Sequence, residues 1–160
     1  MALIKLNNQS ISAVSALPSG VGNGIVQVVQ HEQSSEHSTN TSLAVSQYTK
    51  SITPTSASNK ILIVWDAPFR RNNSNTATYC DLRLYKNGSE LKKIDGAYTS
   101  TLGERIFMRA NFVYLDSPAT ISSTTYAIYW GLGGTFESGG FIMNDSSSIG
   151  TLTLMEIKGW

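Results

Sequence analysis

The amino-acid sequence predicts an all-β fold, a single antiparallel β-sandwich that is jelly-roll-like and carries an extended N-terminal arm. The composition is the first observation: 22 Ser, 15 Thr and 11 Asn make up 48 of the 160 residues, whereas charged residues make up only 14%. Ser and Asn favour turns and Thr favours strands. The second observation is that short apolar segments with a two-residue alternation recur between turn-forming residues, without a convincing helix. About eight such strands suit a sandwich of one domain.

The first half of the chain contains three strand-like segments. Residues 24–31 form the first segment, residues 42–50 give a weaker signal, and residues 53–59 have the composition of a turn. Residues 60–65 form the most apolar run of the chain, which predicts a central strand that is buried on both faces.

The second half of the chain begins with a hairpin signal. Residues 76–86 and 89–94 flank Asn87-Gly88, a pair that tolerates the positive φ angles of a type I′ turn. A strand over 105–115 should place one set of side chains on a common face: Ile106, Met108, Phe112 and Tyr114. Residues 116–118 turn the chain into a strand over 124–130, where Tyr126, Ile128 and Trp130 alternate. Residues 141–143 and 151–157 supply the last strands, and the alternation of Leu152 and Leu154 predicts a closing strand with one buried face.

Residues 1–24 differ from the rest and are expected to form the arm, with the sandwich domain over 25–160. Their apolar residues follow neither a helical nor a strand period, and Pro18 would interrupt a helix. The segment is either a disordered leader or an extended arm that docks on a neighbouring molecule, and we favour the docked arm. The candidate residues for contact with a partner are apolar: Leu3, Ile4, Leu6, Ile11, Val14, Leu17 and Trp160.

The charge pattern bears on partners and location. The net charge is +1, and the pairs Arg70-Arg71 and Lys92-Lys93 are expected to be solvated loop charges, so nucleic acid is not an expected partner. The apolar run over residues 1–6 is too short for a signal peptide, and no stretch is apolar enough to predict a membrane span. The chain is therefore expected to be made in a cytoplasm. A surface this poor in charge favours assembly into an oligomer.

Catalytic chemistry is not predicted, and neither is a cofactor. His31-Glu32 and Glu36-His37 could in principle bind zinc, but their spacing fits a solvated polar loop better. No Gly-x-Ser-x-Gly turn exposes a serine nucleophile. Cys80 is expected to be a buried thiol. Trp65 and Trp130 are expected in the core, whereas tyrosines near strand ends leave a carbohydrate-binding surface open.

Four segments of the chain resemble a known family. Residues 51–63, Ser-Ile-Thr-Pro-Thr-Ser-Ala-Ser-Asn-Lys-Ile-Leu-Ile, look like a segment of a β-domain found in virion proteins of tailed bacteriophages, often marine or cyanobacterial. The resemblance continues in Phe-Val-Tyr-Leu-Asp-Ser-Pro-Ala-Thr (112–120), in Thr-Thr-Tyr (124–126) and in Leu-Thr-Leu-Met-Glu-Ile (152–157). Together the segments cover roughly residues 25–157 in the expected order.

The resemblance implies a virion structural protein without catalytic residues. Such domains occur as head decoration and on tail fibres. We expect a capsid decoration or cement protein rather than a fibre, because the sequence predicts no long shaft or coiled-coil segment. It would form a homotrimer and bind the major capsid protein or other virion proteins. The alternative is a tail-fibre or receptor-binding component that recognises glycans of the host surface.

Overall fold

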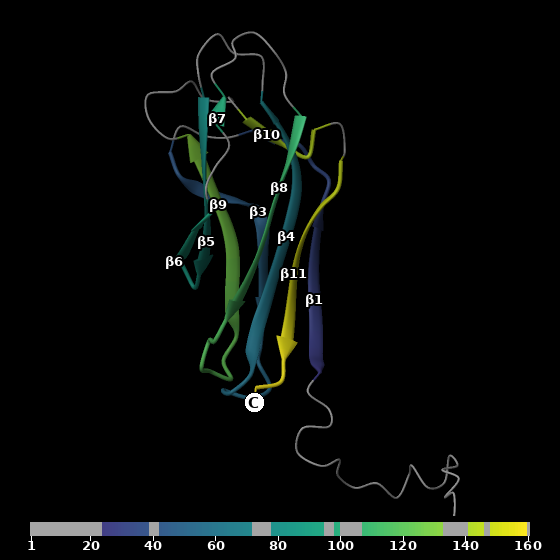
Figure 1. Ribbon diagram of the computed structural model, residues 1–160, viewed down its shortest axis with the longest axis vertical. Coiled ribbons are helices and arrows are strands. Elements are labelled where there is room, and N and C mark those ends of the chain that lie inside the picture. The colour runs from purple at the N-terminus through teal and green to yellow at the C-terminus, as the bar shows by residue number, and fades with distance from the viewer. Residues whose placement is uncertain are drawn as a thin grey trace, which may run out of the picture.

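The computed structural model describes residues 24–38, 42–71, 78–94, 98–99, 107–132, 141–145 and 148–159. Within these ranges, eleven strands form two antiparallel sheets that face each other (Figure 1). Sheet A contains β1 (Ile25–Gln33), β2 (His37–Ser38), β4 (Lys60–Arg71), β8 (Phe107–Asp116), β10 (Phe141–Met143) and β11 (Gly150–Ile157). Sheet B contains β3 (Ala44–Ile52), β5 (Thr78–Lys86), β6 (Ser89–Ile94), β7 (Tyr98–Thr99) and β9 (Thr124–Leu132). The predicted β-sandwich is confirmed.

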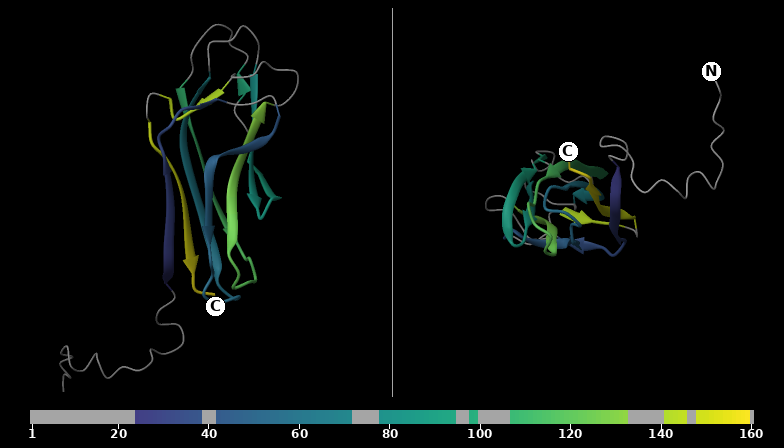
Figure 2. Two further views of the ribbon diagram at one scale, coloured as in Figure 1. Left: turned by 180° about the vertical axis from the view of Figure 1, so that it is seen from behind. Right: turned by 90° about the horizontal axis from the view of Figure 1, so that it is seen from below.

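The long strand β4 organises sheet A. One side of β4 pairs with β11 and, further along, with β10, while the other side pairs with β8 over ten residues. β1 pairs with β11 and forms one edge of the sheet, and β2 pairs with β10. Sheet B has the order β3-β9-β5-β6, with β7 beside the start of β5. Figure 2 shows the two sheets as layers around a common interior.

The core lies between the inward faces of β4, β9, β5 and β11. Every second residue of β4 from Ile61 to Phe69 is buried, and Trp65 lies there beside Tyr48 of β3, with 5.8 Å between ring centroids. Trp130 and Cys80 are buried as well, so these three predictions are confirmed. Burial, with a smaller contribution from Asp81, raises the pKa of the Cys80 thiol to about 12. The thiol therefore stays protonated and behaves as a small apolar side chain.

The central strand differs from the prediction in two respects. It runs from Lys60 to Arg71 rather than ending at residue 65, and only its inward face is fully buried. Leu62 and Val64, which point outward, are half-buried because no described layer covers the outer face of sheet A. Both faces of β4 carry apolar side chains, as predicted, but only the inward face lies in the core.

Two buried carboxylates stabilise the end of the sandwich at which the C-terminus lies in Figure 1, which we call the lower end. Glu156 of β11 accepts hydrogen bonds from the amides of Gln27 and Asn59, both at 2.6 Å, and from the backbone N–H of Thr55 at 2.7 Å. Asp116, at the end of β8, accepts a hydrogen bond from a tyrosine of β9 and pairs with a lysine of β5. Each carboxylate thus ties together segments that are distant in sequence.

Candidate interaction surfaces

The outer face of sheet A carries a continuous apolar zone near the lower end. The pairing register places Val28, Met155, Leu62 and Leu115 side by side across β1, β11, β4 and β8. Two further valines lie next to this row on β4 and β8. We call this zone the apolar face; its residues are Val28, Leu62, Val64, Val113, Leu115 and Met155.

Side-chain exposure shows that the apolar face is at the surface. Val28 is 52% exposed, Val113 65% and Leu115 43%. Toward the other end of the same outer face the residues become polar: Arg109 of β8 forms an ion pair with Asp66 of β4. Contiguous exposed apolar surface bordered by polar residues is typical of an interaction site.

The outer face of sheet B has a different character. Arg83 of β5 pairs with Asp81 at 2.5 Å and with Glu90 of β6 at 2.6 Å. Beside this charged group, Tyr85 and Tyr129 stack on each other with 3.9 Å between ring centroids. Charged side chains favour contact with water, so the two outer faces are unequal. Sheet A presents the face that gains more from a protein partner.

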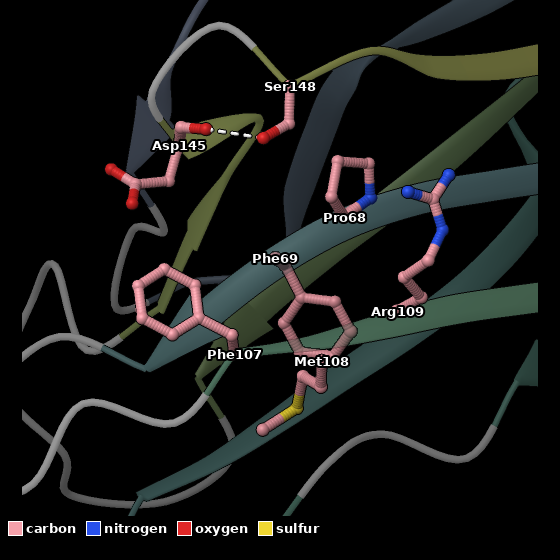
Figure 3. Close-up of a pocket in the computed structure, with 7 residues that line it drawn as sticks. All are labelled: Pro68, Phe69, Phe107, Met108, Arg109, Asp145 and Ser148. Atoms are coloured by element: carbon pink, nitrogen blue, oxygen red, sulfur yellow. Dashed lines mark hydrogen bonds between the residues drawn. The ribbon is translucent and has the colours of Figure 1, made fainter.

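A pocket of about 290 Å³ lies near the start of β8, at the opposite end of the sandwich from the C-terminus (Figure 1). Phe69 of β4 and Phe107 and Met108 of β8 supply apolar side chains, while Asp145 and Ser148 lie across from them (Figure 3). Phe107 is 68% exposed, and Asp145 forms an ion pair with Arg70 at 2.7 Å. An exposed aromatic ring beside carboxylate, hydroxyl and guanidinium groups matches the chemistry of a sugar, which has both apolar faces and hydroxyl groups.

The two histidines do not form the polar loop that the sequence suggested. His31 lies in β1 with its ring edge-on to Tyr48, at 6.3 Å between centroids, and His37 lies in β2 beside Trp130, at 5.5 Å. The loop between the two strands is only three residues long. Strand pairing with β11 and β10 draws both rings toward aromatic neighbours. Across the described ranges, no three His, Cys, Asp or Glu residues gather to hold a metal ion.

The residues that carry the family resemblance are mainly structural. Residues 51–63 include Thr55 and Asn59, and residues 152–157 include Glu156, to which both donate hydrogen bonds. The other two segments meet in the same way, because Tyr126 donates a hydrogen bond to Asp116 at 2.6 Å. Burial and then the negative charge of Asp116 raise the pKa of Tyr126. The residues that carry the resemblance therefore stabilise the fold, and any binding site has to be sought on the surfaces of the sandwich.

The predicted contact residues of the arm and Trp160 all lie outside the described residues. Their role remains a prediction. The apolar face and the pocket were not predicted from the sequence. A signal for the apolar face was available, because residues 112–115, Phe-Val-Tyr-Leu, place apolar side chains on both faces of one strand.

Comparisons with known proteins return fold likenesses only. No family model matches the chain, and no curated protein matches it. Among solved structures, a protein of the T13 particle of infectious bursal disease virus is 12% identical over 81% of this chain and 30% of that chain, with a TM-score of 0.49. The C-terminal domain of the sugar-binding protein EclA is 14% identical over 94% of this chain and 99% of that chain, with a TM-score of 0.38. A family 35 carbohydrate-binding module from an environmental isolate is 10% identical over 79% and 71%, with a TM-score of 0.27.

These similar structures are therefore viral-particle and carbohydrate-binding proteins. The chain spans about 30% of the length of the T13 particle protein. With identities this low and TM-scores below 0.5, function has to be argued from the residues of this chain. Within the described ranges, no helix has the length and apolar character needed to cross a membrane.

Proposed function

We propose that this chain is a structural protein of a virus particle that binds other particle proteins through the apolar face. The observation that carries the proposal is the row of apolar side chains across four strands of sheet A. Burying apolar surface gains roughly 25 cal/mol for each Å², which favours association of this face with a partner. The low content of charged residues, 14%, is consistent with a surface that is partly covered after assembly.

The specific role that we propose is decoration of a tailed-bacteriophage head. The support comes from the resemblance of residues 51–63, 112–120, 124–126 and 152–157 to phage virion domains, and from the apolar residues of the predicted arm. In this proposal the apolar face binds the major capsid protein or another virion protein, and the arm contributes further contact.

The number of copies in the virion tests this role. We expect hundreds of copies in each particle of the phage that encodes the chain, measured by quantitative mass spectrometry of purified virions. Head shells are built from many repeated subunits, whereas a tail carries few. A few tens of copies or fewer would contradict head decoration and favour the tail, and complete absence from virions would contradict the proposal as a whole.

The apolar face is tested by two matched substitutions on β1. Val28→Lys places a charge in the apolar face, and Gln30→Lys places the same charge two residues further along, outside it. Both positions are exposed and point outward, so both variants should fold. We expect Val28→Lys to reduce attachment to virion shells by about tenfold or more, because a charge must then be desolvated at the interface. Gln30→Lys should attach normally; equal attachment by both variants would exclude the apolar face.

A second candidate function is recognition of host-surface glycans, and the pocket beside Phe107 favours it. Its aromatic ring could stack on a sugar while Asp145 and Ser148 bind hydroxyl groups. A glycan array with the purified chain tests this function. Specific binding that is lost in Phe107→Ala and kept in Val45→Ala, an exposed apolar position on sheet B, would support a receptor-binding component. An array without specific signals would leave no support for it.

A further inference from the structure

β8 is an edge strand of sheet A. It pairs with β4 from Ile61–Asp116 to Arg70–Phe107, ten consecutive pairs without a shift in register. Within the part of the chain that the structure describes, no strand lies on its other side. In an antiparallel strand, alternate residues direct their N–H and C=O groups away from the neighbour. The free side of β8 therefore offers a straight row of backbone donors and acceptors.

The other long edges of the sandwich carry features that discourage pairing with another chain. β1 has a register shift between Ile25 and Gln27, and β3 has one between Val45 and Thr49. The hairpin of β5 and β6 has a shift as well, and β6 exposes two adjacent lysines. Bulges and lysines are common means by which edge strands avoid association.

β8 has none of these protective features. Its sequence, Phe-Met-Arg-Ala-Asn-Phe-Val-Tyr-Leu-Asp, contains neither proline nor lysine, and its one cation, Arg109, is already paired with Asp66. Three of its outward side chains are large, apolar and exposed: Phe107, Val113 and Leu115. A long, regular and apolar edge of this kind favours the addition of another strand.

We propose that β8 pairs antiparallel with β8 of a second copy of this chain. Pairing must oppose outward with outward side chains, so the two-fold axis passes through a residue position. We place it at Asn111, where the opposed side chains match best. Phe107 then lies opposite Leu115 of the second copy and Arg109 opposite Val113, while the two Asn111 side chains meet at the axis. The strand is thus complementary to itself, as a two-fold interface requires.

The inward side chains favour the same register. Ala110 lies opposite Phe112 of the second copy, which matches a small side chain with a large one, and Met108 lies opposite Tyr114. All four are only partly buried in the single chain and would be further covered in the pair. A register centred on Phe112 would instead oppose Met108 with the buried carboxylate of Asp116, which already binds a lysine and a tyrosine.

The pair joins the two A sheets into one continuous sheet. Because the two-fold axis is perpendicular to the sheet, both apolar faces lie on the same side and form one larger surface. This inference goes beyond the proposed virion role and does not depend on it. It is measured on the purified chain in solution, so its outcome is separate from that of the copy number in virions.

Cysteine cross-linking tests the register directly. In the pair, the two Asn111 residues are directly opposite, which places their Cα atoms about 4.5–5.5 Å apart, within the range that a disulfide spans. The native Cys80 is fully buried and does not compete. We expect Asn111→Cys to form a covalent dimer under mild oxidation. Gln30→Cys, on the exposed opposite edge of the same sheet, should not; absence of the Asn111→Cys dimer would overturn the register.

Sedimentation of the full chain tests the interface itself. We expect a species of twice the 17.4 kDa chain mass, in place of the homotrimer expected from the sequence. Val113→Lys brings a lysine opposite Arg109 of the second copy, so repulsion should raise the dimer dissociation constant by about tenfold or more. Val28→Lys adds the same charge to the same outer face but lies away from β8, and its dimer should persist. A chain that stays monomeric at all concentrations, or an oligomer insensitive to Val113→Lys, would overturn the proposal.

Discussion

At the scale of single residues, Glu156 is held by several hydrogen bonds at once. Its carboxylate is fully buried and accepts hydrogen bonds from Gln27, Thr55 and Asn59. Burial opposes ionisation, but the hydrogen bonds from Asn59, Gln27 and Thr55 outweigh it and hold the pKa of Glu156 below its ordinary value. Glu156 therefore stays ionised and accepts hydrogen bonds from the side chains and backbone around it. Such a carboxylate is suited to hold the turn over residues 53–59 against β11, and not to transfer protons.

Replacing this carboxylate should weaken the fold. We expect Glu156→Gln to lower the free energy of unfolding by about 2–4 kcal/mol at neutral pH, because an amide cannot accept hydrogen bonds at both of its polar atoms. Chemical denaturation measures the change. Glu32→Gln, at an exposed position of β1, is the matched control and should differ from the parent by less than about 0.5 kcal/mol.

The same group gives the fold a dependence on pH. Because the pKa of Glu156 is lower in the folded state than in the unfolded chain, its stabilising contribution is complete above pH 4.5 and is lost as the pH falls through the folded-state value. We expect the melting temperature of the parent to decrease as the pH is lowered through this acidic range. The melting temperature of Glu156→Gln should decrease less. Identical acid profiles would show that Glu156 is not the group responsible.

At the scale of elements, β3 and β11 approach each other closely at one glycine. Tyr48 of β3 is fully buried, and its hydroxyl donates a hydrogen bond to the side-chain oxygen of Asn144 at 2.6 Å. A Cβ atom on Gly150 of β11 would lie only 2.0 Å from that hydroxyl. The glycine therefore allows the two sheets to close around the tyrosine.

This contact predicts a specific coupling between the two residues. We expect Gly150→Ala to lower the free energy of unfolding by about 1–3 kcal/mol, because the added methyl group must displace Tyr48. In a Tyr48→Phe background the penalty should be smaller, since the clashing oxygen is gone. A double-mutant cycle by chemical denaturation measures the coupling, and equal penalties in both backgrounds would show that the hydroxyl is not what limits the approach.

The strands also differ in how far local sequence determined them. The β5–β6 hairpin follows from Asn87 and Gly88, whose φ angles are +50° and +80° as the turn type requires. By contrast, His31 and His37 were expected in a loop because their neighbours are polar, whereas their positions depend on pairing with β11 and β10. Local turn chemistry can be read from adjacent residues, but a ladder partner more than a hundred residues away cannot.

At the scale of the whole molecule, β1 and the end of β11 stay in contact beyond their paired residues. The carbonyl oxygen of Gly24 accepts a hydrogen bond from the N–H of Lys158 at 3.1 Å, which extends the contact between β1 and the end of β11. Within the described ranges, the buried core residues all lie on strands of the two sheets.

Removal of residues 1–23 tests whether the arm is needed for folding or for attachment to a virion partner. We expect the shortened chain to unfold cooperatively with a melting midpoint within about 4 °C of the parent, and to lose attachment to its virion partner. Thermal unfolding and binding to virion shells measure the two properties. A shortened chain that attaches at full occupancy would contradict the proposed role of the arm and leave the apolar face as the binding surface.

The sequence by itself determined the fold class, the hairpin at Asn87-Gly88 and the inward residues of β8, β9 and β11, because strand periodicity and turn chemistry are local properties. Only the tertiary structure decided which outer face is apolar and which edge is free. Val28, Leu62, Leu115 and Met155 are far apart along the chain, and the register of four strands brings them into one row. The unprotected edge of β8 likewise exists only because β4 occupies one of its sides and no described strand occupies the other.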